Sequence, residues 1–301
     1  MTMKRVNAIW QAGTIMNVTA SANTTDKPVA VIVGATSKWQ SDGRNTKLVH
    51  GKPIPDDHLP DSAKWGVGGA LAQRFAKEGF FVVLTTRTAA NADELAKAIR
   101  NQGGDCLVVE LDLVSQQSIA DAFSKIRELA GDPSVLIYNA GYLEGRDLPP
   151  EMELLEHFPL EMFETAQHIA SRGPFLIAKE VLPAMRKNGK GSFFFTNNAN
   201  SLRGRKRFTG QSLYYPRVLM RALAQALTEE YWPHGVHVAN VVIDGTIDSP
   251  GTRALPAAQA DPNILIDPDR IAEAYYYLHC QHRSCWSHEI QLTSASCTPS
   301  H

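Results

Sequence analysis

Short apolar runs alternate along the chain with longer segments in which apolar residues recur every three or four positions. Short runs rich in Val, Ile and Phe are typical of buried strands, whereas the three-to-four spacing is typical of amphipathic helices. The runs predict seven strands, at Val29–Gly34, Phe80–Thr86, Cys106–Leu113, Val135–Asn139, Ser192–Thr196, His237–Ile243 and Glu289–Leu292. Because strands that alternate with helices form parallel βαβ units, we expect an α/β fold with one doubly wound, seven-stranded parallel sheet.

Two of the intervening segments carry an apolar stripe that we expect to face the sheet. The stripes consist of Ile119, Ala122, Phe123, Ile126 and Leu129, and of Leu219, Ala222, Leu223, Ala226 and Leu227. Residues three and four positions apart share one side of a helix, so each stripe would be buried on one face. We therefore assign these apolar residues to the core and not to a ligand site.

Composition and charge restrict the class of protein. The chain has 301 residues, of which 44% are hydrophobic and 20% are charged, and its formal net charge is -1. This is typical of a soluble globular protein, and the balanced charge provides no attraction for nucleic acid or for an anionic membrane. Four cysteines are too few for a disulfide scaffold, and no apolar run is long enough to span a bilayer, so we expect a cytoplasmic protein.

The predicted strands place a single domain at residues 28–301. Residues 1–27 form an expected N-terminal extension, which resembles a signal peptide superficially but is interrupted by Gln11, Thr14 and Asn17. Residues 37–64 are rich in Pro and contain Gly, and both residue types oppose regular structure. We expect an inserted loop at these positions.

Glycines lie on both sides of the inserted loop. Gly34-Ala35-Thr36 ends the first predicted strand, and Gly66-Val67-Gly68 opens the helical segment after the loop. Together they resemble the Gly-x-x-x-Gly-x-Gly turn of the short-chain dehydrogenase/reductase family, here split by the insertion. Such glycines let the backbone approach a pyrophosphate, whose charge rests on the amides of the helix N-terminus. The resemblance implies a Rossmann-like fold and cofactor contacts at Gly34, Thr36, Gly66, Val67 and Gly68.

Three further segments match the family. Asp112 follows the third predicted strand, where the family has an Asp that contacts adenine, and Asn139-Ala140-Gly141 ends the fourth. Gly245-Thr246-Ile247 matches a segment that brackets the nicotinamide, although Asp244 replaces the usual Pro. The resemblance implies cofactor contacts at Asp112, Asn139, Gly141, Gly245 and Ile247. It covers Pro28 to Thr293 and implies an NAD(P)-dependent oxidoreductase that takes a small-molecule substrate and assembles as a homodimer or homotetramer.

The end of the second predicted strand favours one cofactor. NAD-specific members of the family have an acidic residue there, which accepts hydrogen bonds from the ribose 2′-hydroxyl and would repel a 2′-phosphate. This chain has Thr86 followed by Arg87. A neutral hydroxyl beside a guanidinium suits the phosphate, so we expect NADP, with NAD as the less favoured cofactor.

The catalytic residues of the family are missing at the expected positions. The family uses a Tyr that exchanges a proton with the substrate oxygen, and a Lys four residues later that lowers the pKa of this Tyr. A Ser orients the oxygen, and an Asn holds a water molecule. The ungapped register anchored at Leu202-Arg203-Gly204 puts Asn198 at the Ser, Gln211 at the Tyr, Tyr215 at the Lys and Ala170 at the Asn. We therefore expect an atypical active site.

Two tyrosines are candidates for the missing acid. Tyr214 and Tyr215 lie one helical turn beyond Gln211, on the same face, and Arg217 could supply a cation to either of them. Ser201 and Tyr214 have the separation seen in the family, although this shifted register also lacks the Lys. The candidate catalytic residues are therefore Tyr214, Tyr215, Asn198, Gln211 and Ser201. Aromatic packing of the two tyrosines is the structural alternative.

An amide-lined pocket leaves other functions open. Asn197, Asn198, Asn200 and Gln211 would surround the place of a substrate carbonyl, and amides donate hydrogen bonds without exchanging protons. Such a site could polarise an oxygen during hydride transfer, or it could bind a ligand without catalysis. Three functions are compatible with the sequence: an atypical NADP(H)-dependent oxidoreductase acting on a carbonyl or alcohol, a catalytically silent NADP(H)-binding or sensing protein, and a non-redox enzyme.

Three remaining segments receive simpler interpretations. His279, Cys280, His282, Cys285 and His288 have the residue types of a zinc site, but side chains around a turn diverge, so we expect no metal. The basic run 203–207 is interpreted as a solvated loop. Residues 251–267 occupy the position of the substrate lid in the family.

Overall fold

The computed structural model describes residues 25–35, 59–141, 152, 154, 156–202 and 215–300. Seven strands form one sheet in the order β3-β2-β1-β4-β5-β6-β9, and all neighbouring strands are parallel. The strands are β1 Val29–Val33, β2 Phe81–Thr86, β3 Asp105–Glu110, β4 Val135–Tyr138, β5 Gly191–Asn198, β6 Val236–Ile243 and β9 Glu289–Leu292. All seven predicted strands are present, and the predicted Rossmann-like α/β fold is confirmed.

Each central strand is buried on both of its faces. Val29, Val31 and Val33 belong to one hydrophobic cluster, whereas Ala30 and Ile32 belong to another. Successive side chains of a strand point to opposite faces of the sheet, so a strand covered on both sides needs apolar residues at every position. This explains why these strands appear in the sequence as continuous apolar runs.

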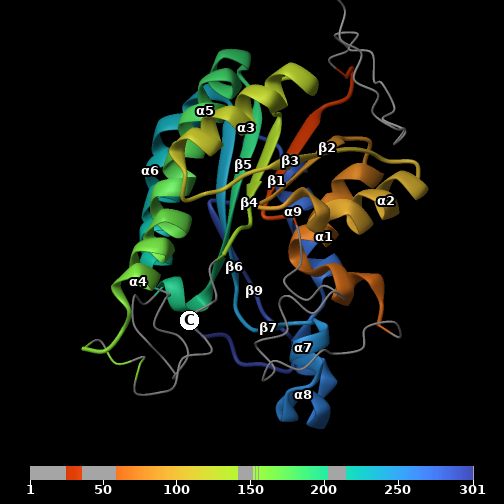
Figure 1. The fold of residues 1–301 in the computed structure, drawn as a ribbon, viewed down its shortest axis with the longest axis vertical. Helices are drawn as coiled ribbons and strands as arrows, with labels where there is room; N and C mark the ends of the chain where they lie inside the picture. Colours follow the sequence, from red (N-terminus) through yellow and green to blue (C-terminus); the bar gives the residue numbers. More distant parts are fainter. Residues whose placement is uncertain are drawn as a thin grey trace, which may run out of the picture.

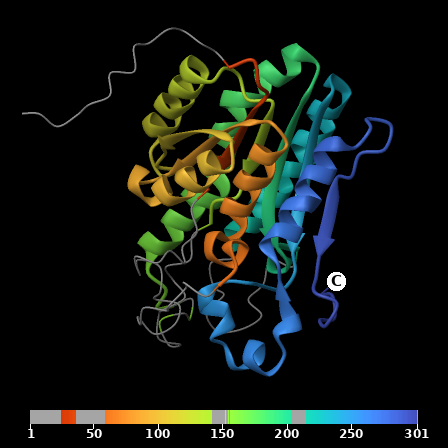
Figure 2. The same cartoon turned by 90° about the vertical axis from the view of Figure 1, so that its right-hand side faces the viewer.

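Helices cover both faces of the sheet (Figures 1 and 2). One face is packed by α1 Asp61–Lys77, α2 Asp93–Asn101 and α9 Pro268–Cys280, which contribute to the cluster of Ala30 and Ile32. The other face is packed by α3 Gln116–Leu129, α5 Gly173–Asn188 and α6 Tyr215–Tyr231. Among the helices of the described ranges, none combines the length and the apolar character needed to cross a membrane.

The structure confirms the predicted apolar stripe on α3 but not the one on α6. On α3, four of the expected residues are buried and only Leu129 is exposed. On α6 the prediction was wrong for most positions, because the buried residues are Met220, Ala224 and Leu227 while Leu219 is 42% exposed. The helix carries apolar residues on more than one face, so periodicity alone could not identify the face that meets the sheet.

A π-helical turn joins α4 to α5. α4 spans Leu160–Gln167, and the π turn spans His168–Arg172. Such a turn changes the hydrogen-bond partners of the carbonyls along the helix. The hydroxyl of Tyr138, fully buried at the end of β4, donates to the carbonyl of Ile169 in this turn. Burial raises the pKa of Tyr138, so the hydroxyl remains protonated as a structural donor.

The predicted lid, residues 251–267, lies within a longer segment that contains short regular elements. They are β7 Thr246–Ile247, α7 Pro250–Arg253, α8 Pro256–Ala260, the 3-10 turn Pro262–Ile264 and β8 Leu265–Ile266. β7 and β8 pair in a separate two-stranded parallel sheet. We call residues 246–267 the lid segment. Other 3-10 turns are found at Ala89–Ala92, Ala199–Leu202 and Trp232–His234.

The predicted inserted loop ends earlier than expected. Residues 61–64 are helical and form a first turn of α1, which is separated from the rest of the helix by a kink at Gly66, with φ 65 and ψ -170. The boundary at residue 64 was therefore wrong, because Gly66 allows a helical turn to precede the glycine motif. Residues 36–58, and residues 1–24 of the expected N-terminal extension, lie outside the described residues.

Candidate functional site

The carboxyl ends of β1 and β4 adjoin at the place where the strand order changes direction. In doubly wound sheets, ligands bind at such a switch point because the loops that follow the two strands separate there. Gly34, which ends β1, has φ +80, and a Cβ added to it would lie 2.7 Å from the Cα of Ala140. The side-chain amide of Asn139 donates to the Gly34 carbonyl over 3.0 Å. Both contacts fix this turn against the end of β4.

The two halves of the glycine motif meet in space. A Cβ added to Gly68 would lie 2.4 Å from the Gly34 carbonyl oxygen, so α1 packs directly against the turn after β1. Gly66 takes a backbone conformation that L side chains rarely adopt, and Val67 is buried. The insertion therefore leaves intact the close backbone approach of a dinucleotide-binding turn. Thr36 lies outside the described residues.

The ends of β2 and β3 carry the expected polar residues. Thr86 is buried, and Arg87, directly after it, is exposed. Asp112 is exposed after β3, where its carboxylate accepts a hydrogen bond from the Val114 amide over 3.0 Å. Arg87 and Asp112 are thus accessible at the carboxyl edge, whereas Thr86 is buried.

Gly141 makes room for a guanidinium group. A Cβ added to Gly141 would lie 2.3 Å from Nη2 of Arg217, which reaches over from the first turn of α6. Nη1 of Arg217 donates to the Thr196 carbonyl on β5 over 3.0 Å. Arg217 therefore connects the ends of β4 and β5 and places a permanent positive charge beside the switch point.

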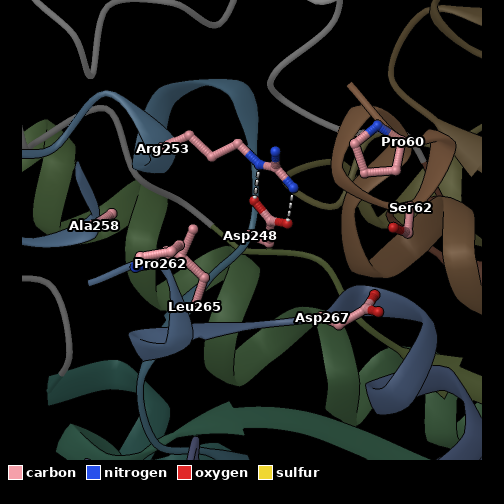
Figure 3. Close-up of a pocket in the computed structure, with 8 residues that line it drawn as sticks. All are labelled: Pro60, Ser62, Asp248, Arg253, Ala258, Pro262, Leu265 and Asp267. Carbon is pink, nitrogen blue, oxygen red and sulfur yellow. Dashed lines mark hydrogen bonds and ion pairs between the residues drawn. The ribbon is translucent and has the colours of Figure 1, made fainter. Parts of the chain in front are cut away.

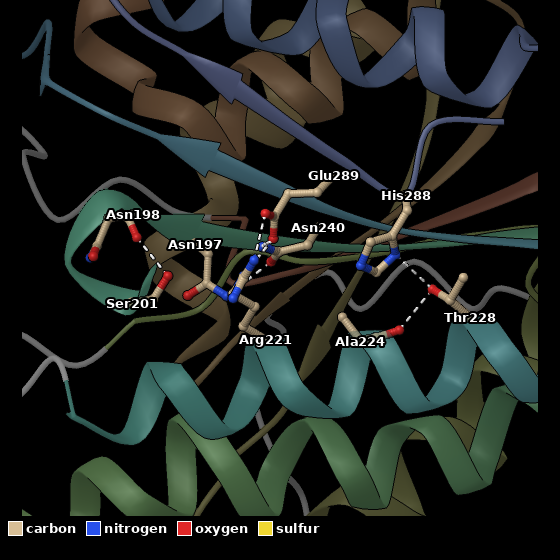
Figure 4. A network of polar contacts seen from close by, with 9 residues as sticks. All are labelled: Asn197, Asn198, Ser201, Arg221, Ala224, Thr228, Asn240, His288 and Glu289. Carbon is tan, nitrogen blue, oxygen red and sulfur yellow. Dashed lines mark hydrogen bonds and ion pairs between the residues drawn. The ribbon is translucent and has the colours of Figure 1, made fainter. Parts of the chain in front are cut away.

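A polar network lies between α6 and the face of the sheet that α6 covers, on the opposite side of β5 from α1 and α9 (Figure 4). We call it the network under α6. The guanidinium of Arg221 donates two hydrogen bonds to the Glu289 carboxylate, at 2.7 and 2.9 Å, and forms a bidentate ion pair with it. Glu289 also accepts a hydrogen bond from Asn240 over 2.7 Å, and Asn240 in turn accepts one from Asn197 over 2.9 Å. Asn197 is buried, and within the described part of the chain its Oδ1 has no hydrogen-bond partner.

The lid segment and the residues at the start of α1 line an open cavity of about 420 Å³ (Figure 3). Asp248 and Arg253 form a two-pronged ion pair in its wall, at 2.6 and 2.7 Å, and Pro60 and Ser62 lie opposite. Gly245 precedes the lid segment, and a Cβ added to it would lie 2.8 Å from Ile266. Ile247, half-buried, pairs with Ile266 in the small sheet. The cavity therefore lies between the lid segment and the residues at the start of α1.

The comparisons with known proteins agree with this geometry. The sequence profile of the short chain dehydrogenases matches residues 62–260. This chain belongs to the short chain dehydrogenase family. It is 29% identical over 189 residues to an uncharacterized oxidoreductase, YxbG, of Bacillus subtilis, with 62% of this chain and 65% of the relative covered. Its expected assignment to an NAD(P)-dependent oxidoreductase family is therefore confirmed.

Two further relatives extend the comparison. The 2,5-dichloro-2,5-cyclohexadiene-1,4-diol dehydrogenase LinX of Sphingobium indicum is 28% identical, with 71% of this chain and 84% of the relative covered. The solved alcohol dehydrogenase of the archaeon Thermococcus sibiricus, complexed with 5-hydroxy-NADP, superposes with a TM-score of 0.68. It is 22% identical and covers 91% of this chain and 99% of its own. At this identity the superposition establishes the shared fold.

Within this short chain dehydrogenase, the predicted catalytic residues are only partly described. Gln211 and Tyr214 lie outside the described residues, and Tyr215 begins α6. Ser201 is fully buried, and its hydroxyl donates to the Asn198 carbonyl over 2.6 Å, closing the turn after β5. Ala170 is buried in the π turn. The Ser201 hydroxyl is thus engaged within the fold.

The expectation of a single amide-lined pocket was wrong for Asn197. Neighbouring residues of a strand point to opposite faces, so Asn197 and Asn198 cannot face the same site. Asn197 lies in the network under α6, whereas Asn198 points away from it at the strand end (Figure 4). The alternation along β5 was visible in the sequence and could have separated these two residues.

From the sequence, Arg217 was expected only as an optional cation beside the two candidate tyrosines. The ungapped register placed Tyr215 at the position of the cationic Lys, but the cation that the structure brings to the ends of β4 and β5 is Arg217. Pro216 at the start of α6 was a usable signal, because Pro favours the first turn of a helix and therefore fixes where the helix begins.

The histidines that had the residue types of a zinc site are bonded elsewhere. Nδ1 of His279 contacts the Ser192 hydroxyl at 2.9 Å, and Nδ1 of His288 contacts the Thr228 hydroxyl at 3.0 Å. In the part of the chain that the structure describes, no group of His, Cys, Asp and Glu is arranged to hold a metal ion.

Proposed function

We propose that this chain is an NADP(H)-dependent oxidoreductase that acts on a carbonyl or alcohol group of a small molecule through non-standard acid-base residues. The observation that carries the proposal is the meeting of Gly34, Gly66 and Gly68 at the switch point, where a side chain at Gly34 or Gly68 would collide with backbone. A turn with this close backbone approach fits the pyrophosphate of a dinucleotide. When bound, the nicotinamide would supply or accept the hydride.

The choice of NADP rests on Arg87. This guanidinium is exposed directly after β2, and the residue before it, Thr86, carries no charge that would repel a phosphate. Arginine binds phosphate through paired, charge-assisted hydrogen bonds. The similar alcohol dehydrogenase of Thermococcus sibiricus was solved with 5-hydroxy-NADP. The 2′-phosphate would thus lie at the end of β2, and the remaining proposed contacts are Thr36, Val67, Asp112, Asn139, Gly141, Gly245 and Ile247.

Proton exchange with the substrate oxygen is assigned to the start of α6. Tyr214 and Tyr215 are the proposed donors, Gln211 and Asn198 the proposed hydrogen-bonding residues, and Arg217 supplies the nearby positive charge. A cation beside a phenol favours its ionised form and therefore lowers its pKa toward neutrality. Ser201 is the least favoured of the proposed catalytic residues because its hydroxyl is buried against Asn198.

The same burial of Ser201 favours a second candidate, NADP(H) binding without turnover. Titration of the purified chain with NADPH and NADH, followed by a turnover assay over carbonyl substrates, separates the two functions. We expect NADPH to bind at least about tenfold more tightly than NADH, which corresponds to ~1.4 kcal/mol. Arg87→Ala should remove this preference, whereas Lys77→Ala should preserve it. No binding of either nucleotide would exclude both functions, and binding without turnover would favour the second.

Assembly as a homodimer or homotetramer is proposed on the apolar outer surface of α4, α5 and α6; α4 and α5 lie end to end, and α6 lies beside them (Figure 1). Leu160 is 67% exposed, Phe175 51% and Leu219 42%. A large contiguous apolar patch on a surface marks an interaction site, and these side chains would contribute to such a patch. Sedimentation of the wild type and of Phe175→Glu tests the proposal, because the variant should shift toward the monomer.

A cytoplasmic location also remains a prediction.

A further inference from the structure

A buried carboxylate marks the end of β6. Asp244 is 7% exposed and stands where the family has Pro. Its backbone amide donates to the Leu292 carbonyl on β9 over 2.8 Å, a bond that Pro could not make. A carboxylate that is withdrawn from water needs hydrogen-bond donors around it, so the partners of Asp244 indicate why an acid is tolerated at this position.

The partners of the Asp244 side chain come from the end of β9 and from the segment after it. Gln291 donates from its side chain over 2.6 Å. Ser300 donates twice, from its backbone amide over 2.6 Å and from its hydroxyl over 2.7 Å. Since Ile243 and Leu292 are paired across β6 and β9, the segment 293–300 leaves the sheet next to Asp244 and folds back onto it. We call residues 293–300 the strap.

The strap also touches the far end of the lid segment. The hydroxyl of Ser294 donates to the carbonyl of Asn263, in the 3-10 turn that precedes β8. The amide of Cys297 donates to the Ser294 carbonyl over 2.9 Å and closes a turn within the strap. The strap is therefore fastened at two places, one before the lid segment and one near its end.

The lid segment is braced internally and would move as one unit. The Asp248 amide donates to the Ile266 carbonyl over 2.9 Å, next to the β7–β8 pairing. The Asp248–Arg253 ion pair and the Ser249 cap of α7 tie its first helix to the same base. Fixing both ends of such a unit fixes its position over the cavity that it shares with the first turn of α1 (Figure 3).

We propose that Asp244 is a positioning residue, which fastens the strap and thereby holds the lid segment in place over the cavity that it shares with the first turn of α1. The consequence for catalysis rests on the proposed function, because the lid segment would then enclose the nicotinamide end of the cofactor and the substrate. Asp244 itself lies outside the cavity lining and acts through the strap and the lid.

Hydrogen exchange of the nucleotide-free protein tests the positioning directly. In Asp244→Ala, we expect amides of residues 246–266 to exchange at least about tenfold faster, because several hydrogen bonds to a charged group are lost, while amides of β1 and β4 keep their rates. Ser300→Ala should give a smaller increase at the same amides. Ser296→Ala is the matched control, since the Ser296 side chain is exposed and only its backbone amide is bonded.

A double-mutant cycle provides the stricter test. If Asp244 acts through the strap, adding Ser300→Ala to Asp244→Ala should accelerate lid exchange by less than about twofold further, because the two residues share one contact. Independent effects would multiply instead and would overturn the proposal. Equal acceleration of exchange in all strands would also overturn the proposal, since Asp244 would then be an ordinary stabilising residue. Unchanged lid exchange in both single variants would overturn it as well.

Kinetics separate this proposal from the proposed function. The Asp244→Ala enzyme should show a KM for NADPH raised by about tenfold or more with a smaller change in kcat, because the lid contributes to binding before it contributes to chemistry. Faster lid exchange with unchanged NADPH affinity would support the positioning and contradict the placement of the cofactor under the lid. If Asp244→Ala fails to fold, Gln291→Leu and Ser300→Ala carry the same exchange measurement.

Discussion

The two halves of the carboxyl edge of the sheet differ in the kind of contact that they contain. At β1 and β4, backbone atoms lie so close together that side chains are excluded, as at Gly34 and Gly68. At β5, β6 and β9, polar side chains form long-range contacts, such as those of Arg217, Glu289 and Asp244. Steric exclusion admits one residue type, whereas a polar contact can be formed by many residue pairs. The first half can therefore be recognised in the sequence as a glycine motif, whereas the contacts of the second half correspond to no fixed motif.

The largest expected effect concerns the backbone contact. Gly68→Ala would place a Cβ 2.4 Å from the Gly34 carbonyl oxygen, which neither backbone can accommodate without movement. We expect a loss of about 1–3 kcal/mol in the free energy of unfolding and no measurable NADPH binding. Urea denaturation and fluorescence titration measure the two quantities.

Gly103→Asn is the control for this substitution. Gly103 has φ +80 with no atom within 4 Å of an added Cβ, and Asn tolerates such a backbone conformation better than other residues. Its NADPH binding should equal that of the wild type. Normal NADPH binding by Gly68→Ala would show that the close approach of α1 is dispensable.

The next effect concerns the cation at the strand ends. Arg217→Met removes the charge beside Gly141 while retaining much of the side-chain volume, and we expect turnover to fall by about 100-fold. Arg217→Lys should recover part of this activity, because it restores the charge without the planar fork. Arg270→Met is the control, because the Arg270 side chain on α9 is exposed. Unchanged kcat/KM in Arg217→Met would show that Arg217 has no role in the reaction.

A smaller effect concerns the network under α6. Burial opposes the ionisation of Glu289, but hydrogen bonds from Arg221 and Asn240 outweigh it and lower the pKa of Glu289. A carboxylate with a lowered pKa stabilises the fold above its unfolded pKa, and this contribution is lost as the pH falls through the folded value. Glu289→Gln should therefore cost about 1.5–3 kcal/mol at pH 7 and progressively less in acid, as measured by urea denaturation.

Glu94→Gln gives the matched comparison for Glu289. Glu94 pairs with Lys97, and both side chains are more than half exposed, so solvent screens the pair and the substitution should change stability much less than Glu289→Gln does. Equal losses in the two variants would mean that the network under α6 contributes no more than a surface ion pair.

The smallest expected effect is a mild loss of stability in acid, caused by the buried His237 and the half-buried His279. Burial lowers the pKa of His237, which stacks on Trp286, and burial together with the charge of His237 lowers the pKa of His279. The unfolded chain then binds more protons than the folded one, so stability is complete above the unfolded pKa and falls as the pH drops below about 6.5.

Unfolding free energies measured between pH 8 and pH 5 test this sensitivity. His279→Gln should flatten the pH dependence, because it removes one of the groups that must be protonated on unfolding. His282→Gln, at an exposed position, should leave the dependence unchanged. An identical slope in the His279 variant would show that His279 is equally basic in both states.

Most of the fold could be predicted, because the strands are buried on both faces and therefore appear as apolar runs. The face of α6 could not, since the exposed Leu219 is as apolar as the buried Met220. In the site, the glycine motif was recognisable despite its insertion. The position of Arg217 was not, because it depends on where α6 begins relative to β4 and β5, and residue spacing along the chain does not specify that distance.

The sequence by itself determined the parallel α/β sheet and the dinucleotide-type turn. These features follow from local constraints: apolar period, glycine conformation and residue identity. Only the tertiary structure decided that Gly141 accommodates Arg217, that Asn197 belongs to the network of Glu289, and that Asp244 fastens the strap. Each of these contacts joins residues far apart in the chain, whose meeting is fixed by the packing of helices on the sheet.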